Sequence, residues 1–138
     1  MSDEASNVSS VMTMKLELVP IPVADVDRAK TFYQDVLGFH VDHDTRPNET
    51  VRVVQLTPPG SACSIVISAG LGEISDVNPG AVKGVHLVVK DIVAMRDLLI
   101  SRGLEISEIV EYPRAIKFAY FADPDGNSWA IQEIPPGI

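Results

Sequence analysis

The sequence predicts an α+β domain in which two βαβββ modules form a curved, mixed eight-stranded sheet around a central pocket. The first observation behind this prediction is a duplication at an interval of 66 residues. Residues 23–26 (VADV) precede an amphipathic stretch as residues 89–92 (VKDI) do, and residues 57–61 (TPPGS) precede an apolar strand as residues 123–127 (DPDGN) do. The second observation is that both copies have the same order of strand and helix patterns. Because one such unit cannot bury its apolar face alone, we expect the two copies to pack against each other.

The first module begins with a strand and a helix whose ends carry characteristic residues. Pro20 and Pro22 end the strand, and Asp25 occupies the N-cap position of the helix that follows. Apolar residues then recur at helical spacing until Gly38, which is placed to end the helix in the left-handed conformation. The expected elements are strands over residues 15–23, 39–44, 51–57 and 62–68, a helix over residues 26–37, and a polar turn over residues 45–50.

The second module repeats this order after a linker without sustained periodicity. Asp91 is the expected N-cap of its helix and Gly103 the expected end, one residue sooner than in the first copy. The expected strands cover residues 84–89, 104–110, 115–122 and 128–134. We therefore divide the chain into a flexible segment (1–14), module one (15–69), the linker (70–82), module two (83–134) and a tail (135–138).

Composition limits the classes of function. The chain has 138 residues, enough for one domain, and a formal net charge of −8, which argues against nucleic acid as a partner. No apolar run reaches the length of about 20 residues that a membrane span needs, and the polar start lacks the features of a secretion signal. We therefore expect a cytoplasmic protein that does not bind membranes. The single cysteine, Cys63, excludes an intrachain disulfide and a cysteine-based zinc site.

Two segments together resemble a known family. They are residues 23–33 (VADVDRAKTFY), continuing to Leu37-Gly38-Phe39, and residues 123–127 (DPDGN) before the final strand. On the duplicated βαβββ pattern, they resemble the vicinal oxygen chelate superfamily, which includes glyoxalase I, extradiol dioxygenases, fosfomycin-resistance enzymes and bleomycin-resistance proteins. The resemblance covers residues 15–134. It implies the glyoxalase/bleomycin-resistance/dioxygenase fold and a homodimer.

The resemblance also implies four positions at which metal-dependent members hold a divalent ion. Counted from the motifs, these positions fall on Leu18, Ser64, Gly84 and Ala130. None of these residues is a usual metal ligand. We therefore expect no cofactor and no metal. The alternative is a displaced divalent metal held by His86 and Gln132, with or without His43.

Candidate ligand-binding residues follow from strand parity. His86 lies two residues beyond Gly84 and therefore shares its face of the strand, and it is also the candidate catalytic acid or base. By the same parity, we expect His43 to face the core and His40 to face solvent. Asp123 and Asp125 are expected to form a turn rather than a catalytic pair, and Trp129 to pack beneath the helices. The candidate ligand-binding residues are His43, Arg52, Ser64, His86 and Gln132.

Two functions are compatible with these residues. The first is a metal-independent protein that binds a small molecule and sequesters a drug or metabolite, as bleomycin-resistance proteins do. The second is a glyoxalase-like lyase or isomerase, or a dioxygenase, that uses a displaced metal or His86 as acid or base. The absence of usual metal ligands at the four family positions favours the first function.

Overall fold

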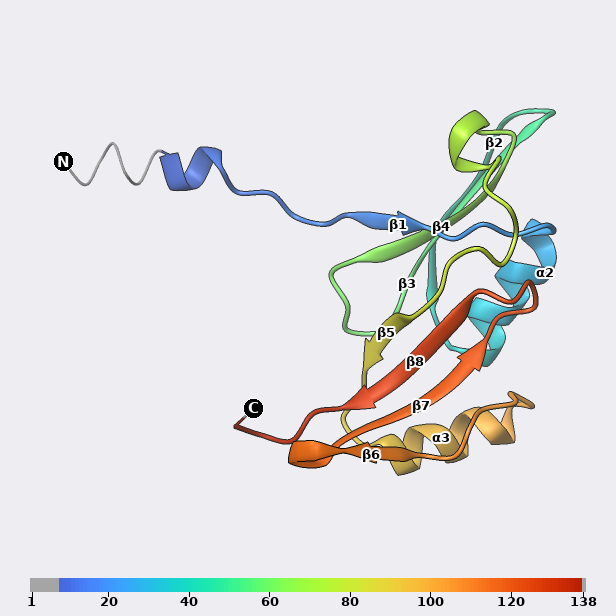
Figure 1. Cartoon of the computed structure of the whole chain (residues 1–138). Coiled ribbons are helices and arrows are strands. Elements are labelled where there is room, and N and C mark those ends of the chain that lie inside the picture. The colour runs from blue at the N-terminus through green and yellow to red at the C-terminus, as the bar shows by residue number, and fades with distance from the viewer. Residues whose placement is uncertain (1–7, 138) are drawn as a thin grey trace.

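The computed structural model describes residues 8–137 and shows eight strands in two sheets of four (Figure 1). The strand order is β1-β4-β3-β2 in the first sheet and β5-β8-β7-β6 in the second. In each sheet the first strand of the module runs parallel to the last, and the other neighbours are antiparallel. The strands are β1 (Leu18–Pro20), β2 (His40–Asn48), β3 (Val51–Thr57), β4 (Ser64–Ala69), β5 (Val85–Val88), β6 (Val110–Tyr112), β7 (Ile116–Ala122) and β8 (Ser128–Glu133).

The α+β class and the two βαβββ modules are confirmed, but the sheet differs from the expected single one. Within residues 8–137 no strand pairing joins the two four-stranded sheets. The modules are instead held together by packing, because the buried residues of both form one apolar core. Each sheet therefore has one face on the shared core and one face directed away from it.

Both helices begin at the predicted N-caps. The Asp25 side chain accepts a hydrogen bond from the Arg28 backbone N–H at 3.1 Å, and the Asp91 side chain accepts one from the Ala94 N–H at 3.0 Å. Each bond satisfies a backbone donor that has no partner inside the helix. The second helix, α3 (Ile92–Ser101), is regular, and the first, α2 (Val26–Thr31), continues into a wider turn.

This wider turn is the π-helix η1 (Phe32–Val36). The Leu37 N–H donates to the Phe32 carbonyl at 3.2 Å, five residues back, where an α-helix would bond four back. Gly38 then leaves the helix with φ of 73°, as its expected role requires. The additional residue that the sequence shows in the first helix is accommodated in this turn.

The predicted strand over residues 104–110 is wrong for most of its length, because β6 begins only at Val110. Ser107 explains the interruption. Its backbone N–H donates to the Tyr120 carbonyl at 2.9 Å, but its hydroxyl, in place of a backbone carbonyl, accepts the Tyr120 N–H at 2.9 Å. The Ser107 carbonyl is bonded by Arg96 Nε at 2.8 Å. The segment therefore runs beside β7 without forming a regular ladder.

Residues 8–16 extend away from the rest of the molecule (Figure 1). Residues 1–7 of the expected flexible segment lie outside the described residues, and residues 8–11 form a short helical turn. Val11, Met14 and Leu16 are largely exposed in this segment. No helix in the described part of the chain is long and apolar enough to cross a membrane.

Candidate functional site

The outward face of the second sheet carries a group of aromatic side chains. We call it the aromatic face and define it by Tyr112, Phe118 and Tyr120 with His86 and Gln132, whose strand register places them on the side opposite Trp129 and Ile131. The Phe118 and Tyr120 rings are parallel within 3°, with centroids 6.2 Å apart, and Tyr112 meets Phe118 edge to face at 5.4 Å.

The aromatic face is accessible from outside. Tyr112 is 46% exposed and Tyr120 41% exposed. Their hydroxyl groups lie 3.3 Å apart, and the hydrogen bond between them raises the pKa of Tyr120. The face therefore offers flat aromatic rings with polar hydroxyl groups at one end.

His86 stands on this face beside Phe118, with ring centroids 5.6 Å apart in an edge-to-face arrangement. Its Nδ1 lies 2.6 Å from the Gly84 carbonyl. A carbonyl only accepts, so Nδ1 carries the hydrogen, and in the neutral ring Nε2 is the acceptor. A hollow of about 350 Å³ adjoins His86 and is bounded by residues 58–61 and 86–88.

The outward face of the first sheet is polar rather than aromatic. The Thr57 hydroxyl bonds to the Asp42 carboxylate and lies 2.5 Å from Ser64 Oγ. Asp42 also bonds to His40 Nδ1 at 2.9 Å, and the Thr57 hydroxyl, followed by His40, lowers the pKa of Asp42. His43 lies on this same outward face, where it pairs with Gln55.

This position of His43 corrects the prediction from strand parity. Val41 pairs with Leu56 and Asp44 pairs with Val54, and these pairs lie on the core face. His40 pairs with Thr57 and His43 pairs with Gln55, and these pairs lie on the outward face. A β-bulge between Val41 and His43 shifts the register by one residue, so that both histidines share one face. Parity counted along the sequence cannot detect such an insertion.

Arg52 lies on the core face of β3, away from the other candidate residues. It is buried and forms ion pairs with Asp27 and Asp44, with 3.0 Å from Nη2 to the Asp44 carboxylate. The bond from Arg52, followed by that from Lys30, holds the pKa of Asp44 well below its usual value. Since its guanidinium is engaged by two carboxylates, we leave Arg52 out of the proposed site.

The positions that correspond to the family's metal ligands do not form a suitable donor set. Leu18 pairs with Ser64 in the first sheet, and His86, not Gly84, pairs with Ala130 in the second. The count from the motifs placed this position on Gly84, because the segment between β5 and α3 is two residues shorter than the segment between β1 and α2. The resulting set is one imidazole, one hydroxyl and two aliphatic side chains, which does not fit a divalent metal.

The structure brings His86 and Gln132 to one face and His43 and Ser64 to a face of the other sheet. Among residues 8–137, no three histidine, cysteine, aspartate or glutamate side chains are grouped closely enough to hold a metal ion. The aromatic rings beside His86 were not among the predicted site residues. Phe118 and Tyr120 are two residues apart in a predicted strand and therefore share one face, and this spacing could have identified them.

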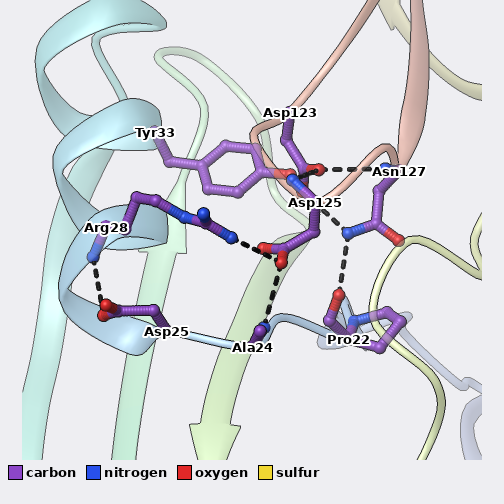
Figure 2. Close-up of polar contacts among 8 residues, drawn as sticks. All are labelled: Pro22, Ala24, Asp25, Arg28, Tyr33, Asp123, Asp125 and Asn127. Carbon is purple, nitrogen blue, oxygen red and sulfur yellow. Dashed lines mark hydrogen bonds and ion pairs between the residues drawn. The ribbon is translucent and has the colours of Figure 1, made fainter.

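The turn at residues 123–127 has a structural role, as predicted (Figure 2). The Tyr33 hydroxyl donates to Asp123 Oδ2 at 2.7 Å and accepts from the Trp129 indole N–H at 3.0 Å. Asn127 donates to the same carboxylate at 2.7 Å and to the Pro22 carbonyl at 2.8 Å. These residues are buried, with Trp129 packed against Tyr33 of the first helix as expected, so this polar network ties η1 of module one to the turn of module two.

The network extends to the start of α2. Asp125 Oδ1 accepts from Arg28 Nη2 at 2.7 Å and from the Ala24 N–H at 3.2 Å (Figure 2). Burial of the Tyr33 hydroxyl, followed by its bond to Asp123, raises the pKa of Tyr33 far above its usual value. Neither aspartate faces an open site, so neither is a catalytic candidate.

The model of the Glyoxalase/Bleomycin resistance protein/Dioxygenase superfamily matches residues 13–131. The chain belongs to this superfamily. The sequence has no significant match among curated proteins.

Solved structures of this superfamily are similar over most of the chain. TnmS3, an antibiotic binding protein from Streptomyces sp. CB03234, is 28% identical, with a TM-score of 0.77 over 90% of this chain and 98% of TnmS3. A glyoxalase/bleomycin resistance protein from the same organism is 30% identical, with a TM-score of 0.70 over 85% and 98%. A superfamily member from Sphaerobacter thermophilus DSM 20745 is 28% identical, with a TM-score of 0.76 over 88% and 98%.

Proposed function

We propose that this superfamily member binds and sequesters a planar aromatic small molecule, without a metal, on its aromatic face. The observation that carries the proposal is the exposed group of rings formed by Tyr112, Phe118 and Tyr120 next to His86. Exposed aromatic rings offer large apolar surfaces that a flat ligand can cover at a small cost in side-chain entropy.

The polar groups at the edges of the face would orient such a ligand. His86 Nε2 accepts a hydrogen bond from a ligand hydroxyl or amine in its neutral form, and the Gln132 amide both donates and accepts. The net charge of −8 and the electron-rich ring faces favour a cationic ligand over an anionic one. The similarity to an antibiotic binding protein agrees with a sequestering role.

Binding of proflavine, a planar aromatic cation, followed by fluorescence anisotropy, tests the proposal. We expect Phe118→Leu, which keeps an apolar side chain but removes the ring, to weaken proflavine binding at least tenfold. His86→Ala should weaken it by more than tenfold, or about 1.4 kcal/mol. His40→Ala is the matched control on the other sheet and should leave the affinity within about twofold.

Two results would contradict the proposal. The first is a proflavine affinity that is unchanged in both Phe118→Leu and His86→Ala. The second is displacement of proflavine by tetraethylammonium, a cation without a ring, as readily as by unlabelled aromatic cations. Urea unfolding of His86→Ala should meanwhile show little loss of stability, because this imidazole is exposed and not a core group.

The enzymatic alternative, a glyoxalase-like lyase or isomerase or a dioxygenase, relies on His86 as acid or base or on a displaced metal. The exposed Nε2 is the feature that it would use. Elemental analysis of protein purified without chelator or affinity tag distinguishes the metal-independent binding protein from an enzyme with a displaced metal. About one equivalent of zinc, iron, manganese or nickel per chain would favour the enzyme.

The homodimer stays a prediction. Sedimentation equilibrium at several concentrations measures it directly. If Phe118→Leu converted a dimer to a monomer, the aromatic face would be a contact between two chains and not the ligand site.

A further inference from the structure

The duplication creates two equivalent junctions between the modules. At the first junction, α2 of module one meets the turn 123–127 of module two, and the polar network fills the space between them. At the second junction, α3 of module two meets the turn of module one at Pro58 and Pro59. The two junctions have related positions because helix caps and turns recur at the same interval of 66 residues.

Three groups that fill the first junction are replaced at the second junction by uncharged, non-aromatic residues. Tyr33 places its phenol ring and hydroxyl at the first junction, fully buried, and Asp125 receives the Arg28 guanidinium there. Their counterparts are a leucine, a proline and an alanine, which have neither an aromatic ring nor a charge. The corresponding pairs are Tyr33 and Leu99, Asp125 and Pro59, and Arg28 and Ala94.

The second junction is accordingly hollow. A cavity of about 130 Å³ lies there, partly open to the surface, and every residue that lines it is apolar. α3 contributes Met95 and Leu99. Val89 follows directly after β5, and Leu37 lies at the end of the first helix. An apolar cavity of about 150 Å³ is large enough to hold benzene. The size of this cavity is therefore close to that of a single aromatic ring.

We propose that this junction cavity binds a neutral apolar group of about the size of one aromatic ring, as a second site that borders the hollow beside His86 and shares Pro58, Pro59, Leu87 and Val88 with its lining. The chain itself indicates the occupant, because the equivalent space at the other junction holds the ring of Tyr33. A charged group is excluded, since no lining side chain could pair with it and burying it unpaired would be costly. The proposal does not depend on the function assigned to the aromatic face.

Benzene is the probe, and its effect on the thermal unfolding midpoint is the measurement. A ligand that binds only the folded state raises this midpoint with concentration. We expect a rise with benzene for the natural sequence and no rise for Leu99→Phe, in which a ring from the equivalent position of Tyr33 fills the cavity. Val93→Phe is the matched control, because Val93 lies on the same helix but is 54% exposed and does not line the cavity. It should keep the full response.

Met95→Trp is a second filling variant in case Leu99→Phe does not fold. It should likewise abolish the response, while benzoate, the charged analogue of the same size of ring, should bind the natural protein at least tenfold more weakly than benzene. An unchanged midpoint with benzene up to its solubility would overturn the proposal. So would an equal rise in the natural protein and in a folded filling variant.

Discussion

The buried hydroxyl of Tyr33 should be one of the most costly single groups to remove from this protein. Tyr33→Phe keeps the ring but deletes the donor to Asp123 and the acceptor for the Trp129 indole N–H. A hydrogen bond to a charged carboxylate contributes about 1.5–3 kcal/mol, and a buried N–H left without a partner costs about 1–3 kcal/mol. Since Trp129 is only 2% exposed, water cannot easily replace the lost acceptor. We expect the variant to lose about 3–5 kcal/mol of unfolding free energy.

Urea unfolding followed by tryptophan fluorescence measures this loss. The midpoint should fall while the slope with urea stays the same, because the surface exposed on unfolding is unchanged. Tyr120→Phe is the matched control: it deletes the hydroxyl of an exposed tyrosine, so its effect should stay within about 0.5 kcal/mol. If Tyr33→Phe lost less than about 1 kcal/mol, the Tyr33 hydroxyl would not be a stabilising link between the modules.

Two further predictions concern Asp44 in module one and Gly70, the first residue of the linker. Asp44→Asn should lose about 1–2 kcal/mol at pH 7, because the Asp44 carboxylate holds the buried Arg52. The bond from Arg52 lowers the pKa of Asp44, so the stability difference in urea unfolding should be full above about pH 4 and shrink as the pH falls below it. Gly70→Ala should lose at least about 2 kcal/mol, since φ is +77° and the new Cβ would lie 2.1 Å from the Thr50 carbonyl oxygen. Gly60→Ala has a similar φ of +81° but open space, so its loss should be only about 1–2 kcal/mol; equal losses by thermal unfolding would argue against the clash.

Features that depend on a few neighbouring residues could be predicted from the sequence. The caps at Asp25 and Asp91 are such features, because a cap is a bond between a side chain and a backbone donor three residues on. The turn at residues 123–127 is another. The 66-residue interval between the copies then led to the two modules and to the correct fold class.

Features that depend on register could not be predicted in the same way. The bulge before His43 and the shorter connection after β5 each change which residues lie level across a sheet, without a local pattern that marks them. The expected metal position therefore fell on Gly84 and not on His86. The role of Tyr33 also escaped prediction, because its partners are 90 and 96 residues away in the sequence.

The π-helix of module one has a consequence for how the two copies could diverge. In a regular α-helix, each inserted residue rotates everything after it by about 100° around the axis. The wide turn at Phe32–Val36 takes up the extra residue locally, so that Phe39 still packs against Tyr33, with ring centroids 5.6 Å apart. The helix of module one could therefore change in length by one residue while the hydrophobic contacts on either side were retained. An insertion that would otherwise change which side chains face the core is confined to one turn, in which the hydrogen bond spans five residues and not four.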